Sequence, residues 1–318
     1  MKKLLMLCLM FGFCLIFFGF TNAAEVSLKE IDEGYEIDLD GKLFANYWTD
    51  YHGTPIVWPI IGPSGVAMTR AYPMSTDADG EKFDHPHHRS LWFTHDGVNG
   101  NRHWMRSIIA HQEFVKAESD GKTATIVTKN DWLDDKSGDP VCKDIRTLVF
   151  GTIGDVRYID FNIEIIAEQE TVVFADTKEG SFGIRVPTSM DVDMRKGGTI
   201  INAEGKKDGE AWAKRSGWVD YSGPVEGKTV GITVMNHSDS FRYPTYWHVR
   251  TYGLFAANPF GVRDFEGDKA KSGELTLKHG ESITLKYRVL FHDGDAASLD
   301  LPKLFEEYCA VKQQEDKK

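Results

Sequence analysis

Strict alternation of apolar and polar residues is the feature that most limits how this chain can fold. The clearest run is Tyr158 to Ile165, where every second residue is apolar. A period of two places one face of a strand in a core and the other in water. Similar runs flank turn-forming residues in four places: 36–47 around Asp40-Gly41, 107–128 around Ser119-Asp120-Gly121, 146–166 around Gly151 to Gly154, and 275–291 around His279-Gly280. Each predicts a β-hairpin.

The rest of the chain carries few helix signals. Further extended segments are expected at 229–234 and 248–256, and one short helix at Leu301–Val311, where Leu304, Phe305 and Tyr308 share a face. Segments 68–101 and 203–225 are expected to be long loops. More than ten antiparallel strands cannot stay in one open sheet without exposing edges and faces. The sequence therefore predicts an all-β protein, a large antiparallel twisted β-sandwich with a short C-terminal helix.

The N-terminus has the order of a secretory signal peptide. Lys2 and Lys3 precede an apolar run from Leu4 to Phe20, and small residues follow up to Ala24. We expect cleavage after Ala23 or Ala24, which gives a signal peptide at 1–23 and a single β-sandwich domain at 24–318. A retained anchor is the alternative. The expected product is an exported protein, periplasmic or extracellular, without stable membrane insertion after cleavage.

Charge and cysteine content limit the partners. The chain has 48 acidic and 37 basic residues and no basic tract, so nucleic acid is not expected to bind. Two cysteines lie beyond the predicted signal, Cys142 and Cys309. An oxidising compartment would join them in a disulfide, or both are buried thiols, and the sequence leaves the two readings open.

The densest polar group lies at 83–104, where five of the eleven histidines fall within nineteen residues: His85, His87, His88, His95 and His103. Pro86 favours an extended His85, so His85 and His87 are expected to face one side and His88 the other. Imidazole suits proton transfer near neutral pH, which makes His88 and His95 candidate catalytic residues.

Other members of this group are candidates for ligand binding: His85, His87, Arg89 and Trp92. One alternative is that the histidines only bond loop carbonyls. Another is a metal bound by His85, His87 and either His95 or His103. The sequence shows no helical His pair and no nearby Cys, so no cofactor is expected.

Two later groups carry the same chemistry. Glu179 precedes a strand with Arg185, and we expect a carboxylate base beside a substrate-binding guanidinium. Further on, His237 and His248 are candidate proton-transfer groups, and Tyr246 and Arg250 share a strand face with His248 and Tyr252. Asn258 follows as a candidate binding residue. The alternatives are a solvated turn at Glu179 and a solvated outer sheet face.

Four of these motifs occur together, in the same order, in a known family. They are Asp84 to Phe93, Gly180 to Arg185, Val219 to Pro224, and Tyr243 to Gly261. The chain resembles an uncharacterised bacterial family labelled "methane oxygenase PmoA". The label implies a copper enzyme, whereas the usual company of the family implies secreted carbohydrate-degrading systems. By analogy with sugar-acting enzymes of galactose-mutarotase-like fold, the ligand would lie on one sheet face.

Three hypotheses follow from these residues. The first is an exported carbohydrate-active enzyme, a hydrolase, lyase or epimerase that uses His, Arg and Glu acid-base chemistry on a sugar or oligosaccharide. The second is a protein that binds the carbohydrate without changing it. The third is the metal-dependent oxygenase that the label implies. All require that the early loop, the strand at Arg185 and the strand at His248 meet in one cleft.

Overall fold

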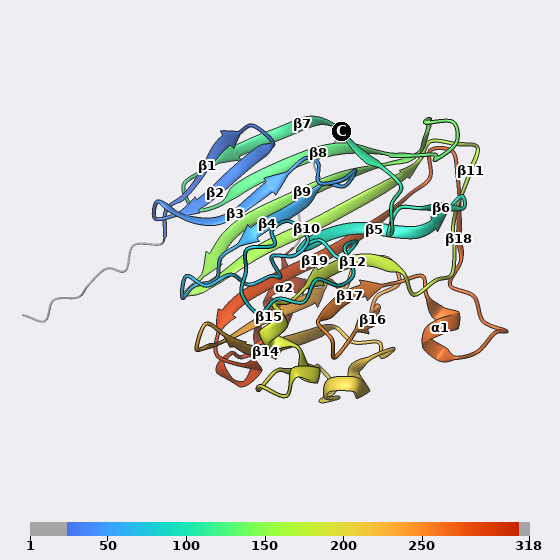
Figure 1. Ribbon diagram of the computed structural model, residues 1–318. Helices are drawn as coiled ribbons and strands as arrows, with labels where there is room; N and C mark the ends of the chain where they lie inside the picture. The colour runs from blue at the N-terminus through green and yellow to red at the C-terminus, as the bar shows by residue number, and fades with distance from the viewer. Residues whose placement is uncertain (1–23, 312–318) are drawn as a thin grey trace, which may run out of the picture.

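Two large antiparallel sheets pack face to face in the computed structural model, which describes residues 24–311 (Figure 1). The first sheet has the order β1-β2-β3-β4-β5-β12-β17-β16, with β6, β11 and β18 attached at its side. The second has the order β13-β14-β15-β19-β10-β9-β8-β7. The predicted all-β sandwich is confirmed.

The strands of the first sheet are β1 (Val26–Ile31), β2 (Gly34–Leu39), β3 (Lys42–Trp48), β4 (Ile56–Ile60), β5 (Leu91–Val98), β6 (Asn101–Arg102), β11 (Thr171–Phe174), β12 (Gly180–Arg185), β16 (Tyr246–Val249), β17 (Leu254–Asn258) and β18 (Leu275–Lys278). Those of the second are β7 (Ile109–Ser119), β8 (Ala124–Leu133), β9 (Pro140–Ile153), β10 (Val156–Ala167), β13 (Thr199–Asn202), β14 (Trp218–Val225), β15 (Lys228–Asn236) and β19 (Ser282–Asp293). The helices are α1 (Val262–Glu266) and α2 (Leu301–Ala310), and short 3-10 turns lie at Thr188–Met190, Val192–Met194, Asp208–Ala211 and Ala296–Ser298.

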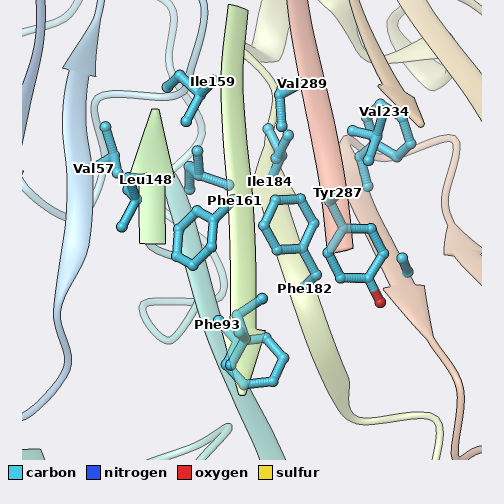
Figure 2. Packing of buried hydrophobic residues seen from close by; sticks show 14 of the residues in the cluster. Val57, Phe93, Leu148, Ile159, Phe161, Phe182, Ile184, Val234, Tyr287 and Val289 are labelled. Carbon is cyan, nitrogen blue, oxygen red and sulfur yellow. The ribbon is translucent and has the colours of Figure 1, made fainter. Parts of the chain in front are cut away.

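The main core lies between the sheets and is built by the predicted alternation. In β10, Ile159, Phe161 and Ile163 are buried, and Phe161 meets Phe182 of β12 edge-on at 5.3 Å between ring centroids. Phe182 also stacks on Tyr287 of β19 at 4.4 Å. Figure 2 shows these rings interleaved with aliphatic side chains from both sheets. Such contacts fix how the two sheets sit on one another, because close-packed interiors tolerate little displacement.

Three of the four expected hairpins are confirmed: β2 pairs with β3, β7 with β8, and β9 with β10. The hairpin expected at 275–291 is wrong, because β18 pairs with β11 in the first sheet. Strand β19 already has β10 and β15 on its two sides, so no edge is free for β18. The His279-Gly280 turn carries the chain from one sheet to the other.

The long loops predicted at 68–101 and 203–225 are shorter in the structure, because each of these segments ends in a strand region, β5 in the first and β14 in the second. Both faces of β5 are covered, and all but one of its residues are buried. The strand therefore lacks the alternation of apolar and polar residues that marks a half-buried strand. The C-terminal helix is confirmed as α2.

The two cysteines are not joined: Cys142 is buried in the core and Cys309 is half-buried on α2. Within residues 24–311, no helix has the length and apolar character needed to cross a bilayer. The predicted signal peptide at 1–23 lies outside the described residues.

Candidate functional site

One of the two smaller apolar clusters covers the outer face of the first sheet, away from the main core. Its buried members are Ile56, Trp92, Trp104, Leu254 and Ala256. Their neighbours on the same strands, such as Phe93 and Phe255, point into the main core instead. The indoles of Trp92 and Trp104 lie 4.9 Å apart, and Trp92 fits against β12 because Gly183 has no side chain: a Cβ there would come within 2.7 Å of the indole. This aromatic platform carries the histidine-rich loop.

The histidine loop folds as a tight turn on the platform. The backbone N–H of His88 donates to the carbonyl of His85 at 2.9 Å, and His85 has a φ of 48°. The expected extended His85, with His88 on the opposite side, is therefore wrong: Pro86 lies at the second position of a turn, where its fixed φ is favoured. The His85 ring stacks between His88, at 4.8 Å, and Tyr252, at 5.2 Å. The turn thereby gathers all three imidazoles of the loop.

Buried ion pairs hold this loop to the sheet. The guanidinium of Arg70, which is fully buried, contacts Glu81 at 3.2 Å, Asp84 at 2.9 Å and Asp191 at 2.9 Å. Arg185 on β12 contacts the same Asp84 oxygen at 2.7 Å. Asp84 directly precedes His85, so the network determines where the turn lies. Arg185 acts here as an anchor of the loop, and Arg70 was not identified from the sequence.

A pocket of about 310 Å³ opens where the loop, the start of β12 and the β16–β17 hairpin meet. Its lining residues are His85, His87, His88, Arg102, Met105, Lys178, Glu179, His248, Arg250 and Tyr252. Residues of the histidine loop, of the segment just before β12 and of the β16–β17 hairpin therefore meet, but Arg185 is not in the lining. Strand β16 ends at Val249, so Arg250 and Tyr252 reach the pocket from the turn before β17 and not from a continuous strand.

His248 is held in one orientation at the pocket wall. On β16, Trp247 and Val249 point into the main core, so His248 points to the outer face. Its Nδ1 lies 2.8 Å from the carbonyl oxygen of Lys178, and a carbonyl can only accept, so Nδ1 carries the proton. Burial lowers the pKa of His248 to about 4, so the ring is neutral at neutral pH. Nε2 then carries a lone pair, and no residue within 24–311 forms a hydrogen bond with it.

Glu179 supplies the carboxylate of the pocket. Its side chain is paired with the Lys178 ammonium at 2.7 Å. Burial disfavours the ionised form, but the Lys178 ammonium, by its hydrogen bond and its charge, outweighs burial and holds the pKa of Glu179 below its usual value. Glu179 is therefore ionised at neutral pH, and it directly follows Lys178, whose carbonyl orients His248.

Two imidazoles of the loop, those of His87 and His88, are also neutral at neutral pH. Burial lowers the pKa of His87 to about 4 and that of His88 well below its usual value, and nearby positive charge adds to the effect. His88 is almost fully buried between His85 and Trp92, and its Nδ1 has no hydrogen-bond partner. Neutral imidazoles offer one donor and one acceptor each, which matches the hydroxyl groups of a polyol.

Several residues expected at the site lie outside this pocket. His95 points inward from β5, where its ring contacts Phe260 at 4.5 Å and its Nε2 lies 2.9 Å from the carbonyl of Ala175. His237 follows β15 of the second sheet, where Nδ1 accepts the Asp239 N–H and the ring packs on Tyr308 of α2. Neither His95 nor His237 lines the pocket.

Tyr246, Asn258 and Trp92 are also absent from the lining. The Tyr246 hydroxyl bonds Glu266, and the Asn258 amide caps a turn by donating to Thr177 and accepting from Phe260. Trp92 lies beneath the loop as part of the platform.

The metal ligand set weighed from the sequence is not assembled. Like His95, His103 is buried and bonds a backbone carbonyl, that of Leu133 at 3.0 Å. Within residues 24–311, no three His, Cys, Asp or Glu side chains are grouped in a way that would hold a metal ion.

Four lining residues were missing from the expected site: Arg102, Met105, Lys178 and Tyr252. Tyr252 had a signal, since it belongs to the aromatic and basic column that includes His248. Lys178 precedes Glu179 in the turn that the alternative interpretation places in solvent. Arg102 and Met105 have no local signal, because only the return of the chain over the platform brings them to the pocket.

Comparison with known proteins gives a family but no activity. The family of unknown function DUF6807 matches residues 34–306. No curated protein matches the sequence. A galactose mutarotase-like protein from Clostridium acetobutylicum superimposes with a TM-score of 0.42 at 13% identity, over 86% of this chain and 99% of that one.

An α-galactosidase from Geobacillus stearothermophilus, solved with stachyose, superimposes with a TM-score of 0.41 at 10% identity, over 85% of this chain and 41% of that one. A galactose mutarotase related enzyme from Lactobacillus acidophilus gives 0.29 at 11% identity, over 85% of this chain and 98% of that one. These similarities concern the fold alone.

Proposed function

The chain belongs to this family of unknown function, and we propose, from the chemistry of the pocket, that it is a carbohydrate-active protein that transfers protons on a bound sugar. The observation that carries the proposal is that His248 lines the pocket with its Nδ1 2.8 Å from the Lys178 carbonyl, which leaves Nε2 as the unprotonated nitrogen. A fixed tautomer gives a base whose lone pair has one direction.

The lining suits a polyhydroxylated ring. His87 and His88 supply neutral donors and acceptors, Glu179 supplies acceptor oxygens, and Tyr252 contributes an aromatic surface. Sugars combine hydroxyl groups with apolar C–H faces, so a site for them needs both directed polar groups and ring faces. The pocket offers both within one hollow.

The number of carboxylates in the pocket argues against glycoside hydrolysis. Glycoside hydrolysis ordinarily uses two carboxyl groups on either side of the scissile bond. Among the described residues that line the pocket, Glu179 is the only carboxylate. We therefore favour elimination or epimerisation over hydrolysis. In an elimination, His248 accepts a proton from a sugar carbon, the C–H electrons form a C=C bond, the C–O bond to the leaving group breaks, and His248 passes the proton to the departing oxygen. In an epimerisation, the carbon takes up a proton again on its other face, and in both reactions Glu179 binds a hydroxyl of the sugar.

We also propose that the protein acts outside the cytoplasm. The charged residues and apolar run at positions 2–20, followed by small residues, support export to the periplasm or beyond.

The test is turnover of a sugar panel by His248→Gln. His279→Gln is a matched control, because its Nδ1 also lies 2.8 Å from a backbone carbonyl, that of Glu168, but in the turn between β18 and β19, far along the chain from the pocket. We expect hydrogen exchange at a sugar carbon in deuterated water, or an unsaturated product, with wild type and the control only.

Two outcomes would contradict the proposal in different ways. If His248→Gln turns over substrate like wild type, this residue is not the base. If wild type binds sugars in calorimetry and returns every one unchanged, the protein is a carbohydrate binder, the second function that a pocket of neutral imidazoles and ring faces supports.

A further inference from the structure

A second hollow, of about 390 Å³, adjoins the pocket. It is lined by Tyr51, His52, Pro73, Pro86, His87, Arg89 and Met105. His87 and Met105 belong to the lining of both hollows, so they form the wall between them. Each hollow alone is near the lower end of the roughly 300–1,000 Å³ of small-molecule sites. Together they make a cleft that can hold more than one sugar ring.

Arg89 is the unusual residue of the second hollow. It is only 7% exposed, yet it forms no ion pair with any residue that the structure describes. Its single hydrogen bond runs from Nη1 to the carbonyl of Tyr51 at 3.3 Å, and its buried Nε has no partner. Burial lowers the pKa of Arg89, against the smaller opposing influence of Tyr51 and Asp50. A buried charge without a counter-charge is costly, so such a residue calls for an explanation.

The other buried arginines show what is normal in this protein. Arg70, Arg146, Arg185 and Arg288 each contact at least one Asp or Glu side chain at 3.2 Å or less. Arg89 is the exception among the buried arginines of residues 24–311, and it is the one that lines a hollow.

Arg250 in the first pocket shows the same pattern. It forms no ion pair, and its guanidinium lies over the rings of Trp212, at 5.6 Å, and Tyr252, at 5.4 Å. The one carboxylate that lines the first pocket, Glu179, is already paired with Lys178. The cleft thus has unpaired positive charge in both halves, in a chain whose net charge is −11. Such focused charge attracts anionic ligands.

We propose that the two hollows bind one acidic oligosaccharide, with the carboxylate of a uronate unit on Arg89 and the neighbouring unit in the His248 pocket. This inference rests on the proposed function and names its substrate class. The two terminal amino groups, Nη1 and Nη2, carry four N–H groups, of which the structure pairs one with the Tyr51 carbonyl, so they can bind a carboxylate with two parallel hydrogen bonds. The bound carboxylate also supplies the counter-charge that the protein does not provide.

The first experiment uses the unmodified protein and needs no variant. Calorimetry compares oligogalacturonate, oligoalginate and oligoglucuronate with their carboxyl methyl esters, which keep the shape and lose the charge. We expect at least one acid to bind about 10- to 100-fold more tightly than its ester, the range of a charge-assisted hydrogen bond. A sulfated neutral oligosaccharide is included, and a preference for it over every uronate would overturn the assignment of a carboxylate.

The second experiment places the charge at Arg89. Arg89→Gln should weaken binding of the preferred acid to the level of its ester and leave binding of the ester unchanged, while Arg89→Lys should recover part of the difference. Arg157→Gln is the matched control, because Arg157 also donates to backbone carbonyls, those of Leu43 and Ile61, but lines neither hollow. Equal losses for acid and ester in Arg89→Gln would refute the role of Arg89.

The outcomes separate this inference from the proposed function. If neutral sugars and esters bind as tightly as the acids, the acidic specificity is wrong and the carbohydrate pocket stands. If neither acids, esters nor neutral sugars bind, both are wrong.

Discussion

Removal of the Arg70 guanidinium tests whether buried charges hold the histidine loop. Arg70→Met keeps much of the side-chain volume and deletes the contacts to Glu81, Asp84 and Asp191. Asp191, whose side chain is fully buried, then retains only the Lys82 ammonium at 3.2 Å, and Asp84 retains Arg185. Asp191 and Asp84 therefore each keep one positively charged partner but lose the Arg70 guanidinium that lies between them.

The expected cost follows from this arrangement. Breaking a buried ion pair by deleting one partner costs about 3–5 kcal/mol, because the remaining charge is left without compensation. For a chain of this length, such a loss lowers Tm by roughly 6–10 °C. Lys29→Met is the control: Lys29 pairs with Glu36 at 3.3 Å, but its side chain is 69% exposed, so the expected cost is about 0–1 kcal/mol.

Urea unfolding at neutral pH measures both variants, and calorimetry measures sugar binding at a temperature where Arg70→Met is folded. We expect the Arg70 variant to lose both stability and binding, since Asp84 directly precedes the His85 turn. A loss below about 1 kcal/mol, or binding equal to that of wild type, would show that the platform positions the loop without these ion pairs.

Three further predictions follow from the geometry. Burial lowers the pKa of His95 from 6.5 to about 4. The unfolded chain therefore takes up a proton that the folded chain does not, and stability should fall as the pH drops through this window, by on the order of 2 kcal/mol at about pH 5. Urea titrations of His95→Asn should show a shallower fall, and an unchanged slope would contradict this. Gly183→Ala should cost about 1–3 kcal/mol, because the new Cβ would come within 2.7 Å of the adjacent indole, whereas Gly209→Ala meets no atom within 4 Å and should be near neutral in the same thermal melts. Because burial raises the pKa of the Cys142 thiol well above its usual value, alkylation followed by peptide mass spectrometry should label Cys309 first, and equal rates would show that the core opens readily.

Local chemistry predicted much of the fold and part of the site. Alternation and turn residues were sufficient for the hairpins at β2–β3, β7–β8 and β9–β10, because each joins strands that are adjacent in sequence. The same reasoning failed for β18, since whether two strands pair depends on which edges the rest of the sheet leaves free. It failed for β5 because burial on both faces removes the pattern.

The residue types of the site were visible in the sequence, and their positions were not. His87, His248 and Glu179 stood out as polar groups among aromatics, and the structure brings them to one pocket. His95 stood out equally, but the register of β5 turns it into the core. A one-residue difference in strand phase exchanges the two faces, so side-chain chemistry alone cannot tell a buried structural histidine from one that lines a pocket.

What the sequence determined by itself was therefore an acidic, all-β chain with three clusters of imidazole, guanidinium and aromatic side chains. Only the tertiary structure decided that Arg70 and Arg185 anchor the loop while Arg89 has no carboxylate partner. The physical reason is that an arginine becomes an anchor or a ligand-binding group according to whether a carboxylate from elsewhere in the chain reaches it. That depends on contacts between distant segments, which no local pattern records.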